Sequence, residues 1–145
     1  MIQEFVNGIY EYSELLSKLL IISNKFSFVI RSNYTISETE KNILSLFERY
    51  LLLETEVETW PGTILLYGKK ARIYYYAFNQ ETFELLKKTS NDLYEWLHPE
   101  KPEDLCFYNN DEPIFASISH ERDSFFLSEN TDITAPKFEE KAQVQ

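Results

Sequence analysis

Apolar residues recur along the chain at two spacings, one typical of helices and one typical of strands. The helical spacing predicts three helices, over residues 13–23, 37–51 and 80–97. The second helix starts at Ser37 with Glu40 three positions later, the spacing of a capping box in which each side chain binds the other residue's backbone N–H. Ser13 and Asn79 are the expected N-caps of the other two helices.

Alternating apolar and polar positions predict the strands. We expect them at residues 26–31, 53–59, 63–67, 71–78, 105–108, 114–118 and 124–127. Gly68-Lys69-Lys70 predicts a β-hairpin between two of them, with Gly where a positive φ is needed, and the polar turn 109–113 predicts another. The order of elements favours an α+β fold, a mostly antiparallel sheet of five to seven strands with about three helices packed mainly on one face.

The length of the chain sets the number of domains. With 145 residues and 43% hydrophobic content, it can bury one ordinary core, so we expect a single α+β domain over residues 1–129. Apolar spacing disappears after Glu129, which predicts a flexible polar tail over residues 130–145.

Acidic residues outnumber basic ones by 24 to 14, and the formal charge is −10. This sign argues against direct nucleic-acid binding, because affinity for a phosphate backbone comes largely from Lys and Arg. The acids gather on one face of the strand 53–59, at Glu54, Glu56 and Glu58, and in residues 101–145, which hold ten acids and four bases. Such a surface suits a basic protein partner, a mimic of DNA, or solubility alone.

The single cysteine, Cys106, excludes an intramolecular disulfide and suits a reducing compartment. No segment reaches the ~20 apolar residues of a membrane span, and the start of the chain is acidic where a signal peptide would be basic. We therefore expect a cytoplasmic protein that does not bind membranes. Its oligomeric state does not follow from the sequence.

One group of residues could support catalysis by a small hydrolase or transferase. A histidine would act with neighbouring acids or a thiol: His120, Glu121, Asp104 and Cys106. Cys106, however, lies in an apolar strand, where a cysteine more often packs than reacts. The chain has no metal-ligand spacing, and its three glycines form no phosphate-binding motif, so no metal or cofactor is expected.

Aromatic residues near the acidic strand point to binding instead. The run Tyr74-Tyr75-Tyr76 must place its members on both sheet faces, so a sheet covered on one side leaves tyrosine on the other. Trp60, at a bend, can be a core residue or an exposed anchor. The predicted binding surface comprises Glu54, Glu56, Glu58, Trp60, Tyr74 and Tyr76. We therefore favour a protein-binding or inhibitory factor, of the immunity, antitoxin-like or phage-encoded anti-defence type, over an enzyme.

Three segments carry a resemblance to a known group: residues 54–63, ending in Trp60-Pro61-Gly62-Thr63, then 102–107 and 118–121. Over about residues 50–127 the chain resembles small Firmicute-type proteins labelled stage III sporulation protein AH-like. The resemblance implies a shared surface at Trp60, Asp104, His120 and Glu121, and no particular activity. The sequence departs from a sporulation channel component because it has no segment suited to anchor it in a membrane.

Overall fold

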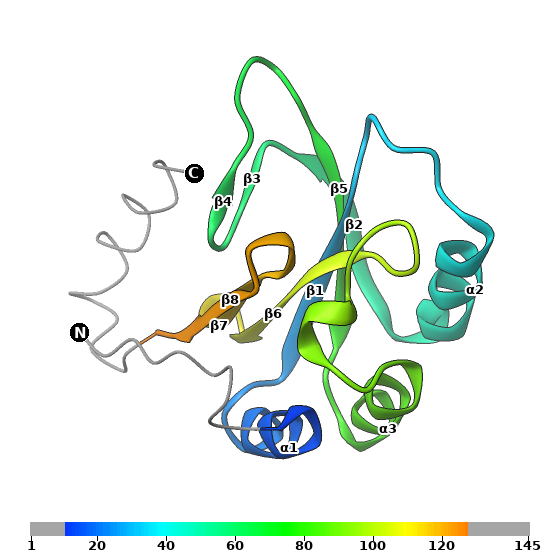
Figure 1. Ribbon diagram of the computed structural model, residues 1–145. Helices are drawn as coiled ribbons and strands as arrows, with labels where there is room; N and C mark the ends of the chain where they lie inside the picture. The colour runs from blue at the N-terminus through cyan, green and yellow to red at the C-terminus, as the bar shows by residue number, and fades with distance from the viewer. Residues whose placement is uncertain (1–10, 128–145) are drawn as a thin grey trace.

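An antiparallel six-stranded sheet with helices on one face forms the centre of the protein (Figure 1). The computed structural model describes residues 11–127. The helices are α1 (Tyr12–Ile22), α2 (Glu38–Phe47) and α3 (Gln80–Thr89), with 3-10 helices η1 (Glu48–Tyr50), η2 (Leu93–Glu95) and η3 (Ser119–Glu121). The strands are β1 (Lys25–Arg31), β2 (Leu51–Val57), β3 (Thr59–Trp60), β4 (Thr63–Ile64), β5 (Ala71–Ala77), β6 (Glu103–Asn109), β7 (Glu112–Ile118) and β8 (Asp123–Phe126). The predicted α+β class is confirmed, whereas the predicted tail lies outside the described residues.

Strand order in the sheet is β2-β5-β1-β6-β7-β8, with β2 at one edge and β8 at the other. Within residues 11–127, the short strands β3 and β4 pair only with each other, as a ribbon between β2 and β5 in the sequence. Figure 1 shows this ribbon away from the three helices. We call the sheet face opposite the helices the open face.

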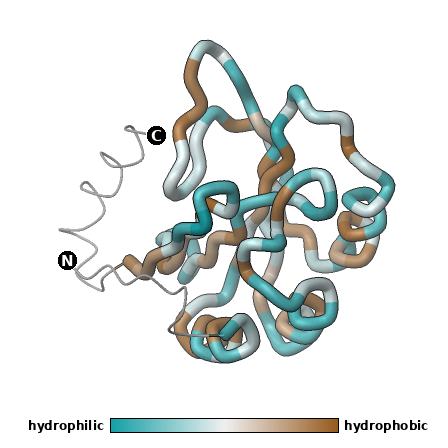
Figure 2. Tube along the Cα trace, viewed as in Figure 1, coloured by the Kyte–Doolittle hydropathy of each residue, from teal (hydrophilic) through white to brown (hydrophobic). Residues whose placement is uncertain are grey.

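The core beneath the helices is rich in aromatic rings. Phe26 stacks on Tyr76 with ring centroids 5.2 Å apart, and Phe28 stacks on Trp96 at 5.7 Å. Leu16 of α1 is fully buried against this cluster. Figure 2 shows hydrophobic stretches on the helices and along the strands that they cover. Burial of large rings supplies much of the hydrophobic stabilisation in a domain of this size.

A second, smaller core lies on the open face, beneath the β3–β4 ribbon. It contains Trp60, Ile73, Cys106 and Ile118. β1 is therefore buried on both faces, although an alternating sequence is typical of a strand with one buried face.

The predicted hairpin between residues 63–67 and 71–78 is wrong. β4 pairs with β3, and β5 pairs with β2 and β1. The chain turns earlier because Trp60 is buried on the open face, and Gly62, at φ +92°, approaches Ile118 there. Gly68 has the expected positive φ of +75°, although its turn joins no paired strands.

Two of the three predicted helices are shorter than their patterns indicated. α2 ends at Phe47, so Leu51 opens β2, and α3 ends at Thr89. The capping box of Ser37 and Glu40 is confirmed, as is the Asn79 cap. Glu11, not Ser13, is the N-cap of α1.

Candidate functional site

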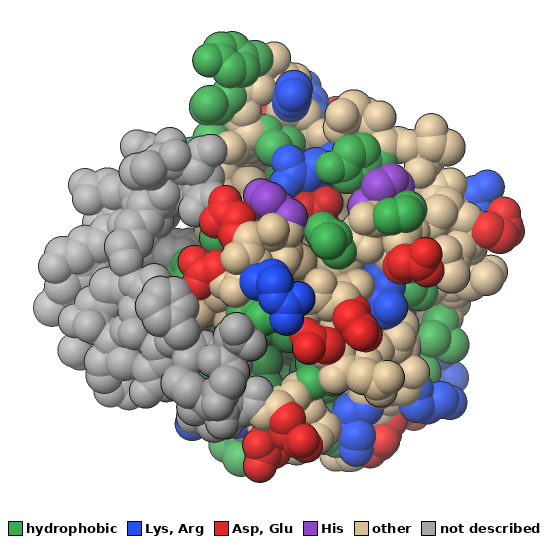
Figure 3. Space-filling model, in the orientation of Figure 1, with side chains coloured by type: hydrophobic (Ala, Val, Ile, Leu, Met, Phe, Trp, Pro, Cys, Tyr) green, Lys and Arg blue, Asp and Glu red, His purple; other side chains and the backbone are tan. Residues whose placement is uncertain are grey.

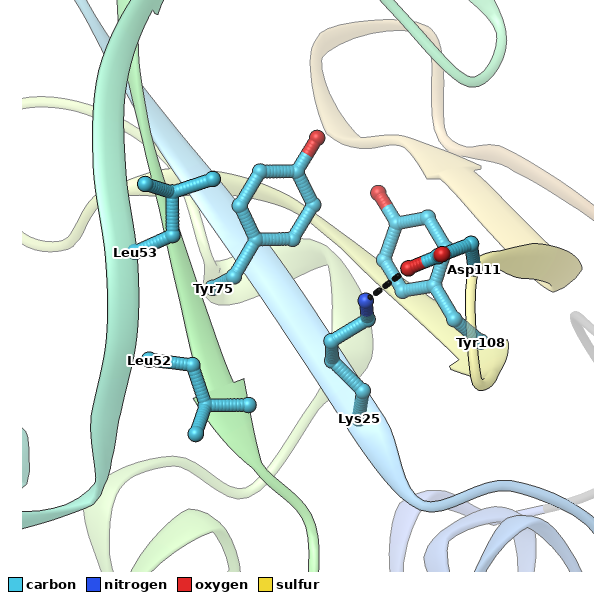
Figure 4. A pocket seen from close by; sticks show the side chains of 6 residues that line it. All are labelled: Lys25, Leu52, Leu53, Tyr75, Tyr108 and Asp111. Atoms are coloured by element: carbon cyan, nitrogen blue, oxygen red, sulfur yellow. Dashed lines mark hydrogen bonds and ion pairs between the residues drawn. The ribbon is translucent and has the colours of Figure 1, made fainter.

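A hollow of about 270 Å³ lies on the open face, where the β3–β4 ribbon does not cover the sheet. We call it the β2–β6 hollow. Its side chains come from four strands and the β6–β7 turn: Leu52, Leu53, Tyr75, Lys25, Tyr108 and Asp111 (Figure 4).

Polar groups at one side of the β2–β6 hollow hold each other in place. The Lys25 ammonium donates to Asp111 Oδ1 at 2.7 Å, and this bond lowers the pKa of the Asp111 carboxyl. The same ammonium lies 5.5 Å and 5.7 Å from the ring centroids of Tyr75 and Tyr108. The Tyr108 hydroxyl bonds to Ser27 Oγ at 2.8 Å. The rings are therefore fixed by neighbours on this side.

The opposite side of the hollow is apolar and belongs to the edge strand. Leu52 and Leu53 of β2 are 59% and 55% exposed. The register shifts between Leu51 and Leu53, so Leu52 is an extra residue in β2. Within residues 11–127, β2 pairs only with β5 along one of its edges, and the backbone groups of the other edge face outward from the sheet.

The acidic stripe, predicted at Glu54, Glu56 and Glu58, lies on the other face of β2. Glu54 is opposite Tyr74 and Glu56 opposite Arg72, so both glutamates share the helix side of the sheet. Arg72 donates to Glu54 at 2.8 Å, which partly neutralises the stripe. The predicted alternation is confirmed for Glu54 and Glu56, while Glu58 falls between β2 and β3.

Three members of the predicted binding surface are not on the surface. Tyr74 and Tyr76 are buried beneath the helices, and Trp60 is buried under its own ribbon. The predicted exposure of Tyr74 and Tyr76 was wrong because the alternation of the tyrosines does not say which face the helices cover. Of the two alternatives for Trp60, core residue and exposed anchor, the structure has the core residue. Within the run 74–76, Tyr75 is the member that reaches the open face, and with Leu52 it was not among the residues predicted for the binding surface.

Cys106 does not have the environment of a nucleophile. Its side chain is fully buried, and the thiol lies 3.5 Å from the Asp104 carbonyl oxygen and 3.7 Å from that of Pro61. Burial, reinforced by the negative charge of Asp104, raises the pKa of the Cys106 thiol far above neutrality. A thiol that stays protonated is a poor nucleophile.

Asp104 is a buried carboxyl at a bulge of β6, where its φ is +63°. It accepts hydrogen bonds from Trp60 Nε1 at 3.0 Å and from the Ser119 backbone N–H at 2.8 Å. Burial, followed by the charge of Glu103, raises the pKa of Asp104 to about 7, against the opposing effect of these hydrogen bonds. Asp104 thereby fixes the β3–β4 ribbon and η3 to the sheet.

His120 and Glu121 form an exposed pair on η3, with Nε2 and Oε2 3.6 Å apart. In the described part of the chain, no hydrogen bond or ion pair joins His120 to Asp104 or Cys106. The four catalytic candidates are thus two separate pairs, one buried and one exposed. The hydrolase or transferase alternative stays a prediction.

A further histidine contact was missed by the sequence analysis. His98 Nδ1 lies 2.9 Å from the buried Glu40 carboxylate, and the Tyr34 ring stacks on the imidazole at 4.1 Å. This contact connects the loop after η2 to the start of α2. Residues so far apart in the sequence carry no spacing signal that could predict it.

Across residues 11–127 there is no group of three or more His, Cys, Asp or Glu residues arranged to hold a metal ion. None of the helices in that range has the length and apolar character to cross a membrane. No protein-family model, curated protein or solved structure matches the chain. The resemblance to the sporulation-labelled proteins stays a prediction.

Proposed function

We propose that this protein is a small acidic cytoplasmic factor that binds, and thereby inhibits, a protein partner along the edge strand β2. Immunity proteins, antitoxin-like proteins and phage-encoded anti-defence proteins are the classes that this role suits. The observation that carries the proposal is the exposure of Leu52 and Leu53 on an edge strand, beside a hollow with an ordered aromatic wall.

Exposed leucines on a sheet edge are unusual in a monomer. Soluble proteins commonly protect such edges with charges or cover them, because the unpaired backbone groups of the edge bind other strands. An extended partner segment could pair with β2 and place an apolar side chain in the β2–β6 hollow. This arrangement would pair the outward backbone groups of β2 and cover its exposed leucines.

Charge favours a basic partner. The formal charge is −10, and Glu54 and Glu56 project from the same strand as the two leucines. Attraction between opposite charges accelerates the encounter of two proteins, and salt weakens that attraction. The buried apolar contact does not depend on salt in this way. Binding should therefore weaken as salt rises without being abolished.

The test compares single variants in capture experiments from a native-type bacterial lysate at low and high salt. Leu53→Lys should reduce capture by about tenfold or more, because it places a charge in the apolar wall. Ile21→Lys is the matched control, since Ile21 is 84% exposed on α1, away from the β2–β6 hollow. Equal loss with both variants, or no specific partner at either salt, would count against the proposal.

A further inference from the structure

A second hollow, of about 290 Å³, lies where η3 meets the β3–β4 ribbon and the loop that follows it. We call it the η3 hollow. Three residues that can carry positive charge line it, and they come from separate elements: Arg31 at the end of β1, Lys69 before β5, and His120 in η3. This convergence stands out in a chain whose formal charge is −10. Figure 3 shows acidic and basic side chains interspersed around both histidines on the face that it displays.

Arg31 is held in position by its neighbours. Its Nε and one terminal nitrogen donate to the same oxygen of Glu103, at 3.2 Å and 3.1 Å. The guanidinium also lies over the Trp60 ring, 5.5 Å from the centroid. Glu103 uses two of the five N–H donors of the guanidinium, so the group is oriented while it retains further donors.

A buried hydroxyl without a partner belongs to the wall of the η3 hollow. Thr63 Oγ1 and Ser119 Oγ have no hydrogen-bond partner among residues 11–127, although both side chains are buried. Thr63 lines the η3 hollow, whereas Ser119 is not among its lining residues. Native interiors seldom leave such groups unpaired, so the Thr63 hydroxyl in this wall points to a polar ligand.

Part of the wall is apolar. Ile64, Leu65 and Leu66 line the η3 hollow from the ribbon and the loop that follows it. Figure 2 shows this segment as hydrophobic at the upper left of the view. A ligand for this hollow therefore needs one polar end and one apolar end.

We propose that the η3 hollow binds a small organic acid, with its carboxylate near Arg31, Lys69 and His120 and its apolar body against Leu65 and Leu66. A single negative charge fits better than a dianion, because Glu121 also lines the hollow and Glu103 already pairs with Arg31. The volume suits roughly ten non-hydrogen atoms, at the ~30 Å³ that a water molecule occupies in the liquid. This proposal is independent of partner binding at β2.

The test uses ¹H–¹⁵N NMR titration of the full chain at constant ionic strength. Benzoate is the probe, benzyl alcohol is its neutral counterpart, and inorganic phosphate is an anion without an apolar part. Benzoate should shift the amides of residues 63–69 and 119–121 saturably, and bind about tenfold or more tightly than the other two. No saturable shift with benzoate, equal binding of benzyl alcohol, or tighter binding of phosphate would overturn the proposal.

Two adjacent lysines provide a matched pair of variants. Lys69 lines the η3 hollow, whereas Lys70 does not, and both substitutions to Gln remove one positive charge. Lys69→Gln should weaken benzoate binding about threefold or more, while Lys70→Gln should leave it within about twofold. Equal weakening by both would show a general effect of charge and contradict a defined site.

Discussion

Asp104 joins three elements of the open face. Its buried carboxyl accepts a hydrogen bond from the Trp60 indole and another from the Ser119 N–H, and so connects the β3–β4 ribbon and η3 to β6. The positive φ at the bulge directs it there. Because the pKa of this buried carboxyl is raised, the stability of the fold should depend on pH.

Stability should depend on pH through Asp104. Its pKa is about 7 in the folded state and lower when unfolded, so the folded chain holds a proton that the unfolded chain releases between about pH 4 and 7. The contribution of Asp104 to the free energy of unfolding therefore falls as pH rises through this range. In urea unfolding, the free energy of unfolding of Asp104→Asn, taken relative to that of the native chain, should rise by on the order of 2 kcal/mol from pH 5 to pH 7.5.

Glu58→Gln is the control for this comparison, since Glu58 is exposed between β2 and β3. Its stability relative to the native chain should change little over the same pH range. A constant difference between Asp104→Asn and the native chain from pH 5 to 7.5 would contradict the assigned role.

Among the helices and strands, features formed by neighbours in the sequence were easier to predict than the pairing of distant strands. Ser37 with Glu40 and Asn79 with the α3 backbone are neighbours in sequence, so their spacing was sufficient. The β6–β7 hairpin was predicted for the same reason. The pairing of β5 with β2 was obscured by the ribbon, because burial of Trp60 beside Asp104 depends on a contact 44 positions away.

The α2 cap should contribute measurably to stability. Ser37 Oγ accepts from the Glu40 N–H and also donates to the Pro99 carbonyl oxygen at 2.5 Å. Ser37→Ala should lower the free energy of unfolding by about 1 kcal/mol or somewhat more, measured by urea titration. Ser45→Ala in the same helix, at an exposed position, should have no such effect. Equal stability of the two variants would show that the cap contributes nothing.

For the molecule as a whole, the helices determine which surface is available for binding. They bury Tyr74 and Tyr76 and leave Tyr75 on the open face. The sequence could indicate that the acidic strand alternates, but the covered face and the edge position of β2 depend on the packing of the whole chain. The candidate site in the structure therefore comprises Leu52, Leu53 and the β2–β6 hollow, and not Trp60 and the buried tyrosines.

Hydrogen–deuterium exchange, with and without the captured partner, tests binding at the β2 edge most directly. If a partner segment pairs with this edge, exchange should slow at amides within residues 51–57, whose outward groups have no sheet partner among residues 11–127. The Leu53→Lys variant should show no such protection under the same conditions. Protection confined to the helices, with exchange in residues 51–57 unchanged, would contradict the proposed mode of binding.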